Sequence, residues 1–275
     1  MLRTAATLLV VLCPAVLAAQ NQVPRDPSPW PQHSMERPRP AVVTPGACVA
    51  APPPSDAIVL MDGRSLDRWR STDLPSDPTT AVPGRAQDRT RVAPTARDAA
   101  RWNLRNGYVE VAPGTGGIAT RDSFGDVQLH VEWRAPLPVK GEGQERGNSG
   151  VFLMGTYEIQ VLDSYHNDTY PDGQAGSIFG QFPPLVNPAR PPGEWNSYDI
   201  VFLRPHFDAT GVVTAPARVT VLFNGVLVQS DQVILGPTTF AHRTAYSAHP
   251  DQLPIELQDH EFPVRYRNIW VRRLE

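Results

Sequence analysis

Hydrophobic and polar residues alternate along several short stretches of the chain, and this period of two predicts β-strands. The clearest stretch is residues 127–134, which places Val127, Leu129 and Val131 on one face and polar side chains on the other. Similar stretches follow at residues 149–155, 157–163, 197–204, 217–230 and 264–274. No run of ten or more residues has helical periodicity, so the pattern predicts a protein built almost entirely from strands.

Turn signals between these stretches predict how the strands connect. Gly155-Thr156 separates two predicted strands and fits a tight hairpin, and Asn224-Gly225 is typical of a type I′ hairpin turn. Short strands joined by tight turns pair antiparallel. The sequence therefore predicts an all-β fold, a sandwich of two antiparallel sheets.

The chain of 275 residues divides into segments of different composition. Residues 1–19 have an early arginine, a short apolar run and small residues near the end, which predicts a secretory signal peptide and export to a periplasm or the exterior. Cys13 follows a leucine, so lipid anchoring is the less favoured alternative. Residues 20–56 are rich in proline and predict an extended, disordered tail or linker. The predicted domain spans residues 57–275, with a polar, breaker-rich loop insertion at 71–100.

Charge and cysteine content narrow the function classes. The formal net charge is −3, with no basic patch that would indicate nucleic-acid binding. No segment after the signal peptide is long and apolar enough to be transmembrane. Removal of residues 1–19 would leave Cys48 as the only cysteine, which excludes an intramolecular disulfide and a cysteine metal site.

Two predicted strands carry unusual polar faces. Glu158 and Gln160 share one face of the strand that begins at Tyr157, and His130 and Glu132 share the polar face of the 127–134 strand. A solvated outer face is one interpretation. If the two strands are neighbours, the alternative is a groove floor that binds the hydroxyls of a saccharide, with nearby aromatic rings stacking on the sugar. The candidate rings are Tyr165, Tyr170, Phe179 and Trp195.

Two further clusters carry candidate chemistry. Asp163, His166, Asp168 and Asp172 fall within ten residues and could bind a divalent cation through oxygen ligands, although they lack the spacing of an EF-hand loop. Alternatively, the histidine and the acids of this loop could act as general acid and base in catalysis. We therefore predict no specific cofactor and leave a divalent cation as a possibility.

The second cluster is Gln258, Asp259 and His260, at the end of a short predicted strand. Adjacent residues on a strand point in opposite directions, so one or two of these three side chains are expected to face the groove.

The ordered pieces VLMDGRSLDRW, WNLRNGYVEV, GNSGVFLMGTYEIQVLDS, GSIFG, GEWNSYDI, VLFNGVLV and IELQDHEFPVRYRNIWV resemble the 3-keto-disaccharide hydrolase domain family from about residue 57 to 275. The resemblance implies a concanavalin-like jelly roll, export, and action on glycosides oxidised at C3. The positions that match the family's motifs are Asn148, Ser149, Glu158, Gln160, Asp163, Gln258, Asp259 and His260.

The residues permit a mechanism suited to such a substrate. The strand from Tyr157 supplies one acid on its polar face, where an ordinary glycosidase needs two carboxyl groups. A 3-keto group acidifies the C2 proton, so a single base can start β-elimination of the glycosidic oxygen, after which water adds back. Glu158, His260 and Asp163 are the catalytic candidates. Polar groups that would bind the substrate are Asn148, Ser149, Gln160, Glu132, His166, Gln258 and Asp259. The competing hypothesis is a lectin-like module that binds the saccharide without cleaving it.

Overall fold

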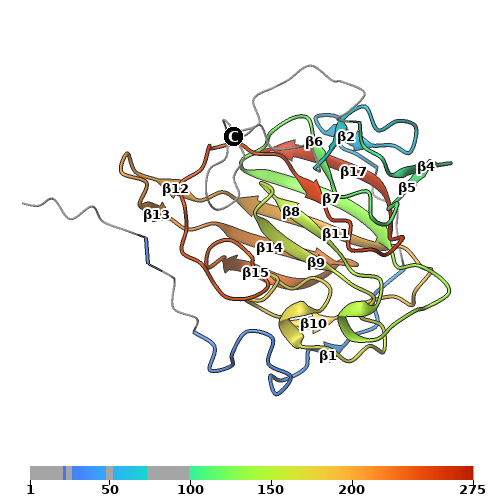
Figure 1. Cartoon of the computed structure of the whole chain (residues 1–275), viewed down its shortest axis with the longest axis horizontal. Coiled ribbons are helices and arrows are strands. Elements are labelled where there is room, and N and C mark those ends of the chain that lie inside the picture. The colour runs from blue at the N-terminus through green and yellow to red at the C-terminus, as the bar shows by residue number, and fades with distance from the viewer. Residues whose placement is uncertain (1–20, 23–26, 48–51, 73–98, 275) are drawn as a thin grey trace, which may run out of the picture.

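Two antiparallel sheets pack face to face in the computed structural model, which describes residues 21–22, 27–47, 52–72 and 99–274 (Figure 1). The larger sheet contains, in spatial order, β15 (Val226–Val233), β14 (Arg218–Phe223), β11 (Asn196–Leu203), β7 (Val127–Arg134), β17 (Arg265–Arg273), β5 (Tyr108–Glu110) and β4 (Asn103–Arg105), with β2 (Ile58–Met61) paired to β17. The smaller sheet contains β3 (Trp69–Ser71), β6 (Ile118–Thr120), β16 (Glu256–Leu257), β8 (Ser149–Leu153) and β9 (Tyr157–Val161). The chain passes repeatedly between the sheets, as in a jelly roll, and the predicted all-β fold class is confirmed.

Short elements complete the described part of the chain. β1 (Ala41–Val42) pairs parallel with β10 (Val186–Asn187), and β12 (His206–Phe207) pairs with β13 (Val213–Ala215). Two single-turn 3-10 helices, η1 (Gly143–Glu145) and η2 (Pro171–Gly173), lie in the loops. Among the described residues, no helix is long and apolar enough to cross a membrane.

The alternating pattern places the core between the sheets. Trp133, Tyr198 and Tyr266 of the larger sheet are fully buried, as are Tyr157 and Ile159 of the smaller sheet. Burial of each large apolar side chain stabilises the fold by about 1.5–3 kcal/mol. The Tyr198 hydroxyl also donates across the core to the backbone oxygen of Gln160 at 2.7 Å, which ties β11 to β9.

Both predicted hairpins are present, although the first turns at Met154-Gly155, one residue before the predicted Gly155-Thr156. Met154 and Gly155 both have positive φ between β8 and β9, and Thr156 N donates to Leu153 O at 3.1 Å. Asn224 and Gly225 have φ values of 52° and 77° between β14 and β15. Positive φ at both central residues is the signature of a type I′ turn.

The condition for a groove floor shared by the two polar strands is not met, because β7 and β9 belong to different sheets. His130 and Glu132 lie on the outer face of the larger sheet. A bulge in β17, with Asn268 at φ 46°, lets Arg267 and Asn268 both reach Glu132, at 2.6 and 2.7 Å. Glu132 is therefore buried in an ion cluster on the far side of the sandwich from β9.

The charges of this cluster stabilise one another. Burial alone would raise the pKa of Glu132, but bonds from His130, Asn268 and Arg267 outweigh it and lower the pKa to about 2. Burial would likewise lower the pKa of His130, but the carboxylates of Asp199 and Glu132 raise it to about 9. Both groups are charged at neutral pH, as expected of a structural ion cluster.

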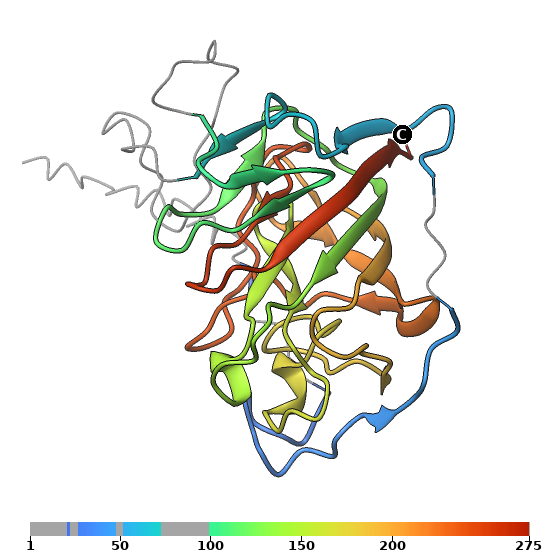
Figure 2. The ribbon, with the colours of Figure 1, turned by 90° about the vertical axis from the view of Figure 1, so that its right-hand side faces the viewer.

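The proline-rich segment differs from the expected disordered tail where the structure describes it. Residues 27–47 run along the lower edge of the sandwich in both ribbon views (Figures 1 and 2). Arg37, 6% exposed, pairs with the buried Asp172 at 3.4 Å and donates to Gln181 O at 3.2 Å. This buried polar pairing holds the segment against the sandwich. Its proline content alone does not predict such contacts. The predicted signal peptide and residues 73–98 of the predicted 71–100 insertion lie outside the described residues.

Candidate active site

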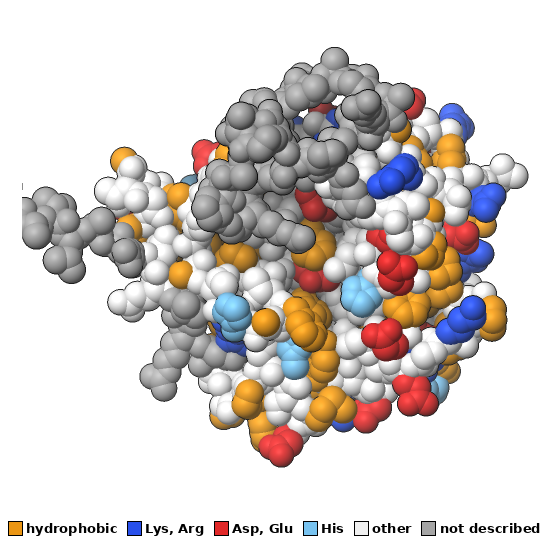
Figure 3. Space-filling model, viewed as in Figure 1, with side chains coloured by type: hydrophobic (Ala, Val, Ile, Leu, Met, Phe, Trp, Pro, Cys, Tyr) orange, Lys and Arg blue, Asp and Glu red, His pale blue; other side chains and the backbone are white. Residues whose placement is uncertain are grey.

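The outer face of the smaller sheet carries two rows of side chains. Strand registers align Arg70, Ala119, Glu256, Phe152 and Glu158 across β3, β6, β16, β8 and β9. Residues directly opposite on paired strands share a face, so these five point away from the core. Figure 3 shows a hollow in the centre of this side of the molecule, with acidic side chains at its floor.

A second row lies beside the first. Gln258, Gly150 and Gln160 follow one another across β16, β8 and β9, because Gln258 N donates to Gly150 O and Gly150 pairs with Gln160. Gly150 leaves room for Glu158: a Cβ added there would lie 2.3 Å from Glu158 Oε1. The carboxyl of Glu158 therefore leans over a gap in β8.

Glu158 is a buried acid among neutral groups. Its side chain is 5% exposed, and burial raises its pKa to about 8. The Gln160 amide lies 3.0 Å from Glu158 Oε1 and donates to it when its nitrogen faces the carboxyl; amide orientations are assigned from the surrounding network. Because burial favours the uncharged form, Glu158 holds a proton at neutral pH and becomes a strong base once ionised.

An amide network extends from Gln160 into η1. The Gln160 amide contacts Gln144 Oε1 at 3.1 Å and Asn148 Oδ1 at 3.2 Å. Gln144 donates in turn to Thr169 Oγ1 at 2.9 Å and to Gly173 O at 3.0 Å. Gln144 is a site residue that the sequence reasoning missed, since it lies in an irregular loop without any periodic signal.

Gln258 lies on the other side of Gly150 and carries an amide oxygen without a partner among the described residues. This atom, Oε1, is buried. A buried polar atom without a partner is costly, and binding sites are where such atoms are tolerated. Glu158, Gln160, Asn148 and Gln258 are thus brought together as the sequence predicted.

Other predicted site residues have structural positions instead. Ser149 faces the core, where its hydroxyl bonds Tyr266 Oη and Gln258 O, both at 2.6 Å. Asp259 accepts from the backbone N–H groups of Thr115, Gly116 and Glu261 at 3.0 Å each. Both side chains are occupied by the fold itself.

His260 and His166 do not reach the amide network. His260 is exposed and stacks on Phe262 with ring centroids 6.2 Å apart. His166 is exposed beside Tyr165. The structure gives neither imidazole a contact with Glu158.

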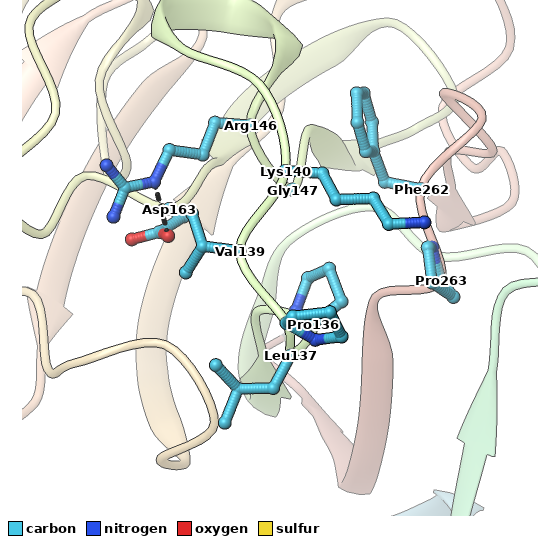
Figure 4. Close-up of a pocket in the computed structure, with 10 residues that line it drawn as sticks. Pro136, Leu137, Val139, Lys140, Arg146, Gly147, Asp163, Phe262 and Pro263 are labelled. Carbon is cyan, nitrogen blue, oxygen red and sulfur yellow. Dashed lines mark hydrogen bonds and ion pairs between the residues drawn. The ribbon is translucent and has the colours of Figure 1, made fainter.

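Asp163 lies at the end of β9 in a separate pocket. Arg146 Nε donates to its carboxylate at 2.7 Å, and Tyr165 N donates at 3.2 Å. Burial raises the pKa of Asp163, while Arg146 lowers it. Figure 4 shows this ion pair facing proline, leucine and valine side chains of the 136–139 loop. The pocket of about 110 Å³ is mostly apolar, and Glu158 is not among the residues that line it. The bonds of Asp163 to Arg146 and Tyr165 instead order the loop that follows β9.

The acidic residues considered as possible cation ligands do not gather in one place. Asp163, Asp168 and Asp172 each pair with a different arginine, namely Arg146, Arg39 and Arg37. Within the described ranges, no three histidine, cysteine or acidic side chains gather as metal ligands.

The aromatic candidates divide between the two sides of the molecule. Tyr170 and Phe179 lie on the β9–β10 loop, next to Glu158: Phe179 N donates to Glu158 O at 3.2 Å. Trp195 instead stacks with Arg134 and Arg267, at 4.7 and 4.1 Å. It belongs to the outer face of the larger sheet, as Glu132 does.

Sequence reasoning also missed Glu256 and Arg70. Both share the row of Glu158, although Arg70 lies 88 residues before it and Glu256 lies 98 residues after it in the sequence. Alternation around the buried Leu257 places Glu256 and Gln258 on one face, and that signal could have identified Glu256. Nothing in the sequence indicates that β3 and β9 share a sheet.

Comparisons with known proteins place this geometry in a family. A family model described as a 3-keto-alpha-glucoside-1,2-lyase-like domain matches residues 56–272. A 3-keto-disaccharide hydrolase of Bacteroides thetaiotaomicron is 25% identical over 181 residues, covering 52% of this chain and 51% of that protein. The chain thus spans about half the length of this curated relative.

Solved structures show the same fold. A candidate glycosyl hydrolase from Parabacteroides distasonis is 41% identical, with a TM-score of 0.72, and the match covers 86% of this chain and 93% of that one. A second candidate glycosyl hydrolase from the same organism has a TM-score of 0.50 at 16% identity, over 80% of this chain and 94% of that one. The second likeness concerns the fold alone.

Proposed function

The chain belongs to the 3-keto-α-glucoside-1,2-lyase-like family, and we propose that it cleaves 3-keto-glycosides with Glu158 as the base that removes the C2 proton. The observation that carries this proposal is one buried carboxyl with a raised pKa of about 8, set among amides on the outer sheet face. The names of its relatives support a saccharide substrate. The predicted signal peptide supports an exported enzyme.

The proposed reaction balances with a single base. Ionised Glu158 takes the proton from C2, and the C–H electrons form the C2–C3 double bond of an enolate at the C3 oxygen. The enolate then collapses to C3=O while a C1–C2 double bond forms and the glycosidic oxygen leaves C1 with the bond electrons. That oxygen takes up a proton. Addition of water to the enone, OH at C1 and H at C2, gives net hydrolysis.

The amides around Gly150 suit the charge that develops. The enolate oxygen needs hydrogen-bond donors placed before the reaction begins. The Gln258 Oε1 has no partner in the described part of the chain, and the amide NH₂ can take its place because amide orientations are assigned from the surrounding network. Gln160 already lies within hydrogen-bond distance of Glu158. We propose that Gln258 donates to the enolate oxygen and that Gln160 orients Glu158.

The test is product release from a 3-keto-disaccharide and from its unoxidised parent, followed by chromatography, with and without a chelator. The proposal predicts release from the keto sugar alone. It also predicts that Glu158→Gln loses at least about a thousandfold in kcat/KM, as expected for loss of an essential base. The exposed Glu194→Gln is the matched control and keeps wild-type activity. Binding of the parent sugar without any release would support the lectin-like alternative.

A further inference from the structure

Four aromatic rings from three separate segments gather at one end of the candidate site. His33 of the docked N-terminal segment lies 4.2 Å from Tyr170, 5.2 Å from Phe179 and 5.3 Å from Phe240, measured between ring centroids. We call these four residues the aromatic cluster. Its outermost member, Phe240, is 74% exposed, so packing of the fold does not account for a phenyl ring at this position.

The aromatic cluster is continuous with the site around Glu158. Phe179 N donates to Glu158 O at 3.2 Å, and Glu158 N donates to Thr238 Oγ1 at 3.1 Å, two residues before Phe240. Gly173 joins Tyr170 to the amide network, because a Cβ added there would lie 2.1 Å from the Tyr170 ring and 2.9 Å from Gln144 Nε2. Figure 3 shows hydrophobic and histidine side chains along the rim of the hollow.

The N-terminal segment holds His33 in a fixed position. His33 has a φ of 62°, and its N–H donates to Asp172 Oδ2 at 3.0 Å. Gln32 Nε2 donates to Thr239 O at 2.7 Å, which connects the segment to the loop that carries Phe240. Burial lowers the pKa of His33 although Asp172 raises it, so the imidazole is mostly neutral at pH 7. A neutral ring packs against apolar surface without the cost of burying a charge.

We propose that the aromatic cluster binds the second sugar ring of a disaccharide, the ring that leaves when the keto sugar is cleaved. This inference rests on the proposed function, because the keto ring must place C2 at Glu158. A neutral hexopyranose fits the chemistry, since one face of the ring presents C–H groups to stacked aromatic side chains and its edge presents hydroxyls. The N-terminal segment is then part of the substrate site.

The experiment compares two substrates in the full-length protein: a 3-keto-disaccharide and the 3-keto-glucoside with a methyl aglycone, which lacks the second ring. In Phe240→Ala, KM for the disaccharide is expected to rise about tenfold, while KM for the methyl glycoside stays at the wild-type value. Phe240→Trp should restore the disaccharide KM. Leu203→Ala, on the outer face of the larger sheet and 39% exposed, is the matched control.

Equal changes in KM for both substrates, or no change for either, would overturn the proposed subsite. If the wild-type protein cleaves neither substrate, the proposed function fails, and the subsite is tested by binding instead. Saturation-transfer NMR with the unoxidised disaccharide should then show weaker binding in Phe240→Ala than in Leu203→Ala. Equal binding by these two variants would overturn the subsite independently of the reaction.

Discussion

Three properties of Glu158 distinguish it from a glutamate on a solvated sheet face. It is 5% exposed, its pKa is raised to about 8, and it leans over a glycine that leaves it space. Burial favours the protonated form, which makes the group an acid at neutral pH and a strong base above it. Residues of this kind cluster at functional sites because structure alone gains nothing from them.

The raised pKa has a consequence for stability. The carboxyl takes up a proton on folding between its ordinary pKa of 4.5 and about 8, so its contribution becomes less favourable as pH rises through this window. Glu158→Gln removes that effect. We expect the two proteins to unfold alike near pH 4 and the variant to be more stable by about 4 kcal/mol at pH 8, at about 1.4 kcal/mol per unit. Urea unfolding measures this, and a difference independent of pH would contradict it.

Gly150 offers a second test at the residue scale. An alanine Cβ would lie 2.3 Å from Glu158 Oε1 and 2.9 Å from Phe152 Cε2, so the flexible carboxyl must move while the backbone stays. Misplacing a catalytic group by about 1 Å costs about a hundredfold in rate. We expect Gly150→Ala to lower kcat to that extent with a small change in melting temperature.

The matched control is Gly46→Ala, where an added Cβ meets nothing within 4 Å. If Gly150→Ala kept the wild-type kcat, the position of Glu158 would not matter to turnover, and its role as base would be wrong.

At the scale of elements, alternation and turn residues predict most strands, and they do so because each strand buries one face. Residues 127–134 became β7 with the expected faces, and Asn224-Gly225 became the expected turn. Which strands share a sheet could not be predicted, because pairing between distant segments leaves no local pattern. Glu132 was therefore assigned to the wrong side of the molecule.

The β17 bulge explains the position of Glu132 in physical terms. Tyr266 and Ile269 are three positions apart and would point to opposite faces of a regular strand, yet both face the core. The extra residue of the bulge, Asn268, turns outward. Strict period-two reasoning cannot anticipate a bulge. For the site, sequence reasoning selected four residues that the structure brings together around Gly150, while Ser149 and Asp259 had equally suitable side chains that the fold uses internally.

Glu132→Gln tests this separation of roles. The change leaves Arg267 and His130 without a buried carboxylate partner and should destabilise the protein by about 3 kcal/mol at pH 7. The loss should shrink as pH falls from 4.5 toward about 2, because Glu132 itself becomes protonated over that range. Turnover per folded molecule should stay at the wild-type value. If Glu132→Gln lost turnover while its stability stayed unchanged, Glu132 would have a catalytic role and the structural role would be wrong.

At the scale of the whole molecule, the docked N-terminal segment changes the boundary of the functional unit. The family model matches the chain from residue 56 onward. Residues 27–47 nevertheless contribute Arg37 to a buried ion pair and His33 to the aromatic cluster. Proline content predicted an extended segment but carried no information on where it lies. The specific partners, Asp172 and Gln181 O, come from a loop with no periodic pattern.

Arg37→Met tests the docking. Asp172 is fully buried, and its Oδ1 has no partner among the described residues, so removing Arg37 leaves a poorly compensated carboxylate. We expect a loss of about 3 kcal/mol in the free energy of unfolding. Exposed Arg39→Met, which removes a pair to the 73% exposed Asp168, should cost less than 1 kcal/mol. Equal losses in both variants would mean that the segment is not held by the buried pair.

The most direct test of the account is cleavage of a 3-keto-disaccharide in D₂O, with the position of deuterium in the product read by NMR. Proton removal by Glu158 predicts deuterium at C2 of the released keto sugar, with kcat/KM rising to a plateau above a pKa of about 8 and both signals lost in Glu158→Gln. Cleavage that leaves the original hydrogen at C2 would contradict the elimination mechanism and the role of Glu158 as its base.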